Sequence, residues 1–237
     1  MRPLLAQSRA ELLMSLRQPE RLLASIVIPA TLLIFFSAVE LDVALESDVD
    51  SLLPGSLAVA LIGSAMTGLG IATGFERRYG VLKRLSSTPL GRARLVAAKV
   101  LALLIFEVIQ IGILVLIGLA LGWDGKISAA LIPSVIAGTL AFGGLGMLLA
   151  GTLPAETNLA VTNALFLFLL LTCGAFVPLD ALPGPLSGAG AATPGAPLVS
   201  LMSWALDAGP FIVADAVRLA AWALIAPVAA AMTFRWE

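Results

Sequence analysis

The sequence predicts an all-α, polytopic integral membrane protein with six transmembrane helices. Of its 237 residues, 59% are hydrophobic and 12% are charged, whereas a soluble domain usually carries about 25% charged residues. The mean hydropathy is +1.03, which is too high for a soluble surface of this size. The apolar runs are continuous and rich in Leu, Ala, Ile and Val, a pattern that favours spanning helices over the alternating strands of a barrel.

The first element, residues 1–20, is expected to be an amphipathic helix that lies in the membrane interface. Arg9, Glu11 and Arg17 are expected on other faces than the apolar one. A plain cytoplasmic extension is the alternative interpretation. The positions that follow the helical rhythm are Leu4, Leu5, Ser8, Leu12, Leu13 and Leu16.

Six apolar segments follow, each near the length of about 20 residues that a helix needs to cross the hydrocarbon core. We interpret the whole chain, residues 1–237, as a single transmembrane domain. The predicted spans are residues 22–39, 52–74, 97–123, 127–153, 159–177 and 210–234.

The segment between the fifth and sixth spans, residues 179–209, is rich in Pro and Gly. It contains PLVSLMSWAL, which is apolar but too short to cross a membrane. Two short re-entrant helices in the outer leaflet would fit this composition. A flexible outer loop is the alternative.

Loop charges predict the orientation of the spans, because Lys and Arg gather on the cytoplasmic side. The loop after the first span carries only acidic charge, whereas residues 74–99 hold half of the chain's 14 Lys and Arg residues. We therefore expect both termini in the cytoplasm. Lys126, in the turn between the third and fourth spans, is expected outside. The basic residues of 74–99 are Arg77, Arg78, Lys83, Arg84, Arg92, Arg94 and Lys99.

The basic loop, residues 75–95, is expected to begin as a short amphipathic helix. Tyr79, Leu82 and Leu85 can share one face of this helix. The residues before Pro89 are expected to form a turn, and Pro89 could start the next helix. On charge alone, orientation and contact with lipid headgroups explain the loop.

The residue order in this loop resembles the cytoplasmic loop of ABC-2 type exporter permeases. That family shows an E-R-E-x-G-T-L-x-x-L pattern followed by T-P-L or S-P-L, and this chain reads ERRYGVLKRL and then TPL. Arg78 stands where the second acid often lies, and Val81 where Thr is common. The resemblance covers the whole chain, because the family also has an N-terminal interfacial helix, six spans and short re-entrant helices between spans five and six.

The resemblance implies that the basic loop is a coupling helix that docks on a separate ATP-binding-cassette ATPase subunit. It also implies a unit of two permeases, as a homodimer or a sibling heterodimer, in a bacterial plasma membrane. Drugs, antibiotics or lipid-like amphiphiles are the implied export substrates. The implied coupling residues are Glu76, Arg77, Arg78, Tyr79, Gly80, Leu82, Lys83, Leu85, Thr88 and Pro89.

The chain has no GxxxxGK[ST] phosphate-binding loop. Mg-ATP is therefore expected in the partner ATPase, and this chain is expected to be neither an enzyme nor a holder of a metal or cofactor of its own. The absence of His argues against Ser-His hydrolysis and HExxH metalloprotease chemistry. We expect no nucleic-acid partner.

Candidate translocation residues lie within the spans. Glu107 and Gln110 are in the third span, where an ionised side chain costs about 2.5–3.5 kcal/mol on insertion scales. Glu107 is either a site for a cationic substrate or proton, or a structural hydrogen-bond partner of another helix. Asn163, Phe166 and Thr172 in the fifth span either line a pathway or only pack helices.

An alternative function is a stand-alone secondary transporter or channel with Glu107 as its intramembrane ionisable site. Asp215 and Arg218 near the outer end of the sixth span are expected to form a local ion pair.

Overall fold

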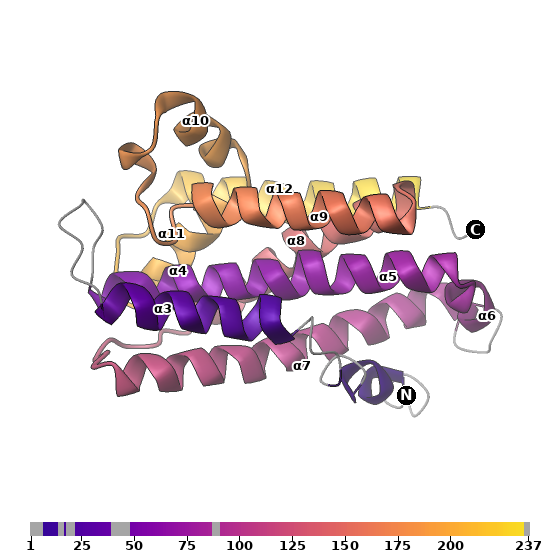
Figure 1. Cartoon of the computed structure of the whole chain (residues 1–237), viewed down its shortest axis with the longest axis horizontal. Coiled ribbons are helices and arrows are strands. Elements are labelled where there is room, and N and C mark those ends of the chain that lie inside the picture. The colour runs from indigo at the N-terminus through magenta and orange to yellow at the C-terminus, as the bar shows by residue number, and fades with distance from the viewer. Residues whose placement is uncertain (1–6, 14–16, 18–21, 39–47, 87–90, 235–237) are drawn as a thin grey trace.

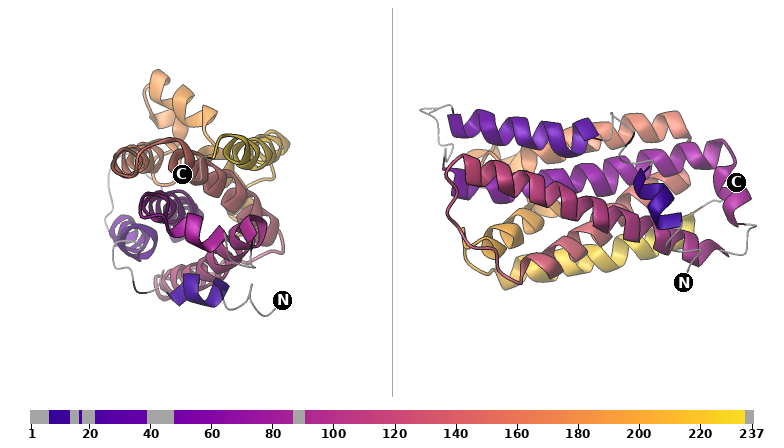
Figure 2. Two further views of the ribbon diagram at one scale, coloured as in Figure 1. Left: turned by 90° about the vertical axis from the view of Figure 1, so that its right-hand side faces the viewer. Right: turned by 90° about the horizontal axis from the view of Figure 1, so that it is seen from below.

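The computed structural model describes residues 7–13, 17, 22–38, 48–86 and 91–234. The long helices run side by side along the long axis of the molecule (Figure 1), and the left view of Figure 2 shows the same bundle from its end. No strand occurs among the residues described. The prediction of an all-α protein is therefore confirmed.

The helices follow the apolar runs of the sequence. Residues 7–13 form a short N-terminal helix, and Leu23–Val27 is a π-helical turn, η1, that leads into α3 (Ile28–Ala38). The remaining elements are α4 (Val49–Ile62), the π-helical segment η2 (Gly63–Gly68), α5 (Leu69–Arg78), α6 (Val81–Ser86), α7 (Gly91–Ala120), α8 (Leu131–Thr152), α9 (Ala155–Thr172), the 3-10 turn η3 (Leu179–Ala181), α10 (Gly184–Ala192), α11 (Gly195–Ala205) and α12 (Val213–Thr233).

Five helices in the described part of the chain are long and apolar enough to cross a membrane. The first predicted span, residues 22–39, contains the shorter apolar helix Ser25–Ala38, so the count of six spans stays a prediction. The five are Val49–Arg78, Arg94–Ala120, Leu131–Thr152, Ala155–Thr172 and Val213–Thr233.

The continuous helix made by α4, η2 and α5 is the core of the bundle. Of the residues in its apolar 18-residue stretch, 94% are buried, whereas the corresponding share in α12, at the periphery, is 22%. Small residues allow this burial, because they let neighbouring backbones approach closely. At Gly55 a Cβ atom would overlap the backbone of Ala175, and at Gly70 it would lie 2.9 Å from Gly146 Cα.

The segment of residues 179–209 folds partly into α10 and α11. The side chains of Leu198 and Met202 in α11 are fully buried in the core that α4 contributes to. Most of α10 is exposed, and this helix projects from the bundle in Figure 1. Whether these helices enter a membrane from one side stays a prediction.

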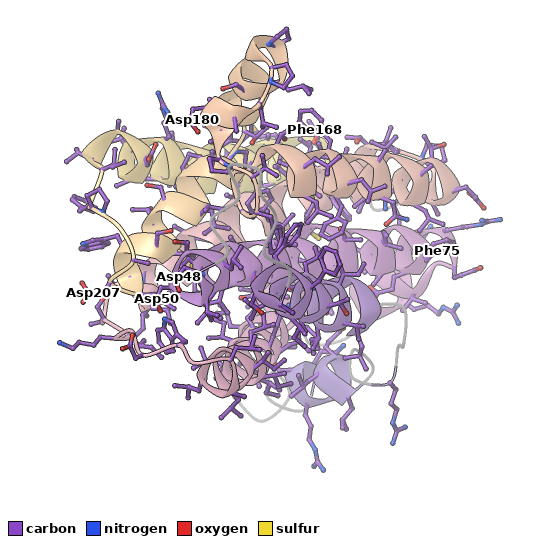
Figure 3. The ribbon with its side chains drawn as sticks, turned by 60° about the vertical axis from the view of Figure 1, so that its left-hand side comes forward. Asp48, Asp50, Phe75, Phe168, Asp180 and Asp207 are labelled. Atoms are coloured by element: carbon purple, nitrogen blue, oxygen red, sulfur yellow. The ribbon has the colours of Figure 1, made fainter. Side chains whose placement is uncertain are left out.

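Charge differs between the two ends of the bundle. Asp48, Asp50 and Asp207 lie at one end, whereas Phe75 lies toward the other, where α5 meets the basic loop (Figure 3).

The predicted ion pair in α12 is confirmed, because Arg218 Nη1 lies 3.5 Å from Asp215 Oδ1.

Candidate functional site at the basic loop

The chain reverses direction between α5 and α6 through a turn at Gly80. Gly80 has φ of +67°, a left-handed conformation that Gly adopts without the steric penalty of a Cβ atom. Tyr79 N donates to Phe75 O at 2.9 Å and Gly80 N donates to Arg77 O at 3.0 Å, which closes the end of α5. The Gly in the ERRYG motif therefore determines where α5 stops and α6 starts.

The turn separates residues that were predicted to share a face. Leu82 is 2% exposed, whereas Tyr79 is 63% exposed and stacks on Phe75 at a ring distance of 6.2 Å. The predicted common face of Tyr79 and Leu82 is wrong, because Tyr79 caps α5 on the far side of the Gly80 turn. Leu85 belongs to α6, and the predicted turn at Thr88 and Pro89 lies outside the described residues.

Two arginines at the end of α5 join the basic loop to the junction of α8 and α9. Arg77 donates to the carbonyl oxygen of Leu153, the C-cap of α8, at 2.5 Å. Arg78 forms an ion pair with Glu156 in the first turn of α9. Both contacts complement the helix dipoles, with a cation at the C-terminus of one helix and an anion at the N-terminus of the next.

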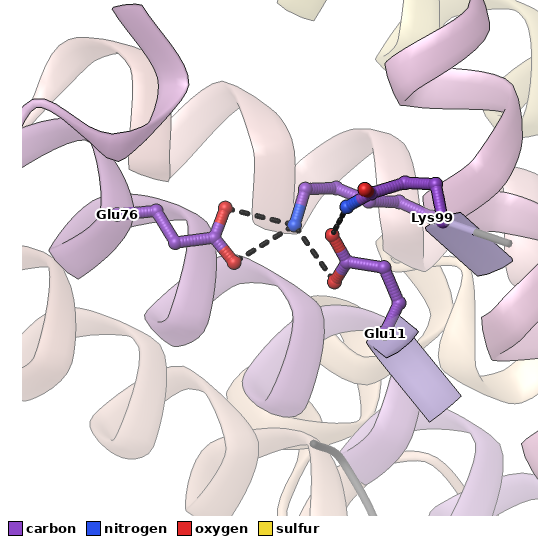
Figure 4. Close-up of polar contacts among 4 residues, drawn as sticks. Glu11, Glu76 and Lys99 are labelled. Atoms are coloured by element: carbon purple, nitrogen blue, oxygen red, sulfur yellow. Dashed lines mark hydrogen bonds and ion pairs between the residues drawn. The ribbon is translucent and has the colours of Figure 1, made fainter. Parts of the chain in front are cut away.

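A buried ammonium group joins three elements at this end of the bundle (Figure 4). Lys99 of α7 is 5% exposed. Its Nζ lies 3.1 Å from Glu11 Oε2 in the N-terminal helix and 2.8 Å from Glu76 Oε1 in α5. Gln7 donates to the other oxygen of Glu11 at 2.9 Å. We call Glu11, Glu76 and Lys99 the Lys99 cluster.

The Lys99 cluster corrects one prediction and adds a residue that the sequence reasoning missed. Glu11 was expected on a face other than the apolar one, but it is buried in the bundle, while Leu13, which was expected on the apolar face, is 43% exposed. The reason is that Lys99 offers Glu11 a charged partner inside the bundle. The available signal was a Lys inside an apolar run, which normally needs a partner of opposite charge.

Glu107 lies deeper in the bundle, at 1% exposure. Ser64 of η2 donates to its Oε1 at 3.4 Å and Thr139 of α8 donates to its Oε2 at 2.6 Å. Gln110 donates to the carbonyl oxygens of Ala60, at 2.8 Å, and Ser25. The structural interpretation of Glu107, a hydrogen bond to another helix, is confirmed for two helices. Its role toward a substrate or proton stays a prediction.

The candidate residues of α9 do not gather at one place. Asn163 is exposed, whereas Phe166 and Thr172 are buried in the protein. Thr172 donates to Phe168 O within its own helix at 2.7 Å. The helix-to-helix hydrogen bond of α9 comes instead from Asn158, which donates to Gly70 O of α5 at 3.0 Å.

The comparisons with known proteins agree with this arrangement. A family model described as ABC-2 type transporter matches residues 4–206, which include the N-terminal helix, the basic loop and the helices up to α11. None of the curated proteins compared with the chain matches it. Because the family model covers more than half of the chain, this protein belongs to the ABC-2 type transporter family and is a membrane component of a transporter.

Proposed function

We propose that this chain is the transmembrane permease subunit of an ATP-driven exporter, and that α6 receives the motion of a separate ATP-binding-cassette ATPase. The observation that carries the proposal is the convergence of contacts at the basic loop. From this loop, Arg77 and Arg78 reach the junction of α8 and α9. Glu76 reaches α7 and the N-terminal helix through the Lys99 cluster.

The surface offered to the partner is the docking face, which we define as Tyr79, Lys83 and Arg84. All three side chains are exposed, while Leu82 on the opposite side of α6 is buried. Arg84 donates to the carbonyl oxygen of Tyr79 at 3.0 Å, which ties α6 to the end of α5. Motion of the docking face is therefore transmitted to α5 through this hydrogen bond.

The other components of the proposed transporter lie outside this chain. Mg-ATP is bound and hydrolysed by two ATPase subunits, and two permeases rock against each other to pass an amphiphilic drug, antibiotic or lipid-like molecule outward. The setting is a bacterial plasma membrane with both termini in the cytoplasm. The family membership and the lack of a phosphate-binding loop in the sequence support this division of labour.

The test replaces two side chains of the docking face and leaves the hydrogen bonds and ion pairs of Glu76, Arg77 and Arg78 in place. The double variant Tyr79→Ala, Lys83→Glu is co-expressed with a tagged ATP-binding-cassette subunit of the same source. We expect loss of co-purification and of ATP-dependent transport in proteoliposomes, with unchanged thermal unfolding. Glu76 and Arg77 are less suitable targets, because both make contacts within the chain.

The matched control is Lys126→Glu, which reverses another exposed lysine, in the turn between α7 and α8. This variant should bind the ATPase as wild type does. Association of the double variant at wild-type strength would contradict the proposed docking face. Transport by the chain without any ATPase would favour the secondary transporter instead.

A further inference from the structure

A small polar cavity lies between the Lys99 cluster and Glu107. Its volume is about 20 Å³, whereas one buried water molecule needs about 10–15 Å³ and several polar partners. Glu11, Ser64 and Lys99 supply polar side chains to its wall, and all three residues are buried. The cavity therefore has the size and the chemistry to hold one water molecule.

The cavity follows one face of α7 toward Glu107. Lys99, Ala102 and Phe106 are among the residues that line it, and their spacing places them on one side of the helix. Glu107 follows Phe106 directly and lies about 12 Å from Lys99 along the helix axis, at about 1.5 Å per residue. Ser64 joins the cavity to this carboxyl, because it lines the cavity and its Oγ lies 3.4 Å from Glu107 Oε1.

The hydrogen bonds around Glu107 favour a protonated carboxyl. The Thr139 hydroxyl lies 2.6 Å from Glu107 Oε2 and 2.8 Å from Val135 O. The Ser64 hydroxyl lies near Glu107 Oε1 and 3.1 Å from Leu61 O. Each hydroxyl has one proton, so the two can serve only two of these four contacts, and a proton on the carboxyl serves a third.

The charges around Glu107 favour the same protonation state. From η2 and α8, Glu107 meets only the hydroxyls of Ser64 and Thr139. In the described part of the chain, no Lys or Arg forms an ion pair with it. A buried carboxylate without a cationic partner is costly, so the carboxyl is more stable with its proton.

The other end of the cavity reaches solvent through the Lys99 cluster. The charged groups along this part of the path are Lys99, Glu11 and Glu76. The Glu11 side chain lines the cavity and is 11% exposed, and the Glu76 side chain is 21% exposed. Glu11 therefore lies between the cavity and the solvent at the end of the bundle that carries the basic loop.

We propose that Glu107 is a proton-binding site that exchanges its proton with solvent at the basic-loop end, through a water molecule in this cavity. In release, the O–H bond of the Glu107 carboxyl breaks and its proton passes to Ser64 Oγ. Ser64 passes its own proton to the water, the water passes one to the Glu11 carboxylate, and Glu11 releases it to solution.

Uptake is the reverse of this sequence. Each group on the path gives up one proton as it takes one, so the only net change is one proton lost from Glu107 and gained by solution. The inference goes beyond the proposed function and does not depend on it, because the exchange needs neither an ATPase nor a transported substrate.

Ala102→Val is the variant that fills the cavity without removing a polar group. Ala102 is 3% exposed and lines the cavity. Ala97→Val is the matched control, because it makes the same substitution on α7 at an exposed position outside the cavity. Ser64→Cys is a second variant of similar size, in which a thiol, a weak donor and acceptor, replaces the hydroxyl that joins the cavity to Glu107.

The test uses infrared spectroscopy of the full-length chain in lipid nanodiscs. The C=O stretch of a protonated carboxyl is assigned to Glu107 by its loss in Glu107→Gln, and its shift after transfer to D₂O gives the rate of proton exchange. We expect this band in wild type at neutral pH, and exchange that is slowed by about tenfold or more in Ala102→Val and in Ser64→Cys. Ala97→Val should change the rate by less than about twofold.

A wild-type spectrum without a protonated carboxyl assigned to Glu107 would overturn the proposal, and so would a wild-type band that does not exchange. Neither result depends on the folding of a variant. Exchange at the wild-type rate in folded Ala102→Val or Ser64→Cys would also overturn it, because the proton would then take another route. The assay contains no ATPase and no nucleotide, so its outcome is independent of the docking test.

Discussion

The side chain of Lys99 joins three elements of an otherwise apolar bundle. Its ammonium group is buried in α7, where the apolar part of the helix begins, and it meets Glu11 and Glu76 from two other elements. A buried charge of this kind is tolerated only when it is paired and hydrogen-bonded. The position of the N-terminal helix against α5 and α7 therefore depends on this one cation.

We expect Lys99→Met to destabilise the protein by about 3–5 kcal/mol, because it leaves two carboxylates facing each other without their cation. Denaturant unfolding in detergent micelles measures the change. Lys83→Met is the control, since Lys83 is exposed and surface substitutions usually change stability by about 0.5 kcal/mol or less. Equal stability of the two variants would show that the Lys99 cluster contributes nothing to folding.

At the scale of elements, α5 and α8 touch through their backbones. A Cβ atom at Gly70 would lie 2.9 Å from Gly146 Cα, and one at Gly146 would lie 2.6 Å from Met66 O in η2, which continues into α5. Close contact at Gly144 and Gly146 of α8 agrees with the packing role that small residues have in membrane helices. Gly143 differs, because a Cβ atom there would meet only Leu69 Cδ2, at 3.8 Å.

Gly70→Val should push α5 away from α8 and destabilise the bundle, since over-packing of a close contact costs about 1–3 kcal/mol or more. The same substitution at Gly112, where a Cβ meets nothing within 4 Å, should have little effect. Thermal unfolding of both variants in the same detergent gives the comparison. A Gly70→Val protein as stable as Gly112→Val would contradict the close contact of α5 and α8.

At the scale of the whole molecule, the separation of acidic and basic ends predicts the orientation in the membrane. Lys83→Cys should react with a membrane-impermeant maleimide only after cells are permeabilised, whereas Lys126→Cys should react in intact cells. The native Cys173 is fully buried and gives no background. The reverse labelling pattern would invert the predicted topology and place the docking face outside the cell.

The sequence predicted the helices better than it predicted their partners. Continuous apolar runs are local signals, so the long helices could be placed from composition and length alone. The pairing of Glu11 with Lys99 joins residues 88 positions apart, and periodicity shows which face a residue occupies but not what that face meets. The prediction that Tyr79 and Leu82 share a face was wrong for a local reason. The positive φ of Gly80 breaks the helical register between them.

The length of the central helix has a mechanical consequence. Val49–Arg78 is 30 residues long, which at about 1.5 Å per residue is about 45 Å, whereas a hydrocarbon core is about 30 Å thick. The helix therefore exceeds the thickness of the hydrocarbon core by about 15 Å. The π-helical segment Gly63–Gly68, whose Ser64 contacts Glu107, lies near the middle of this helix. Under the proposed function, motion received at α6 would reach Glu107 along this one continuous helix.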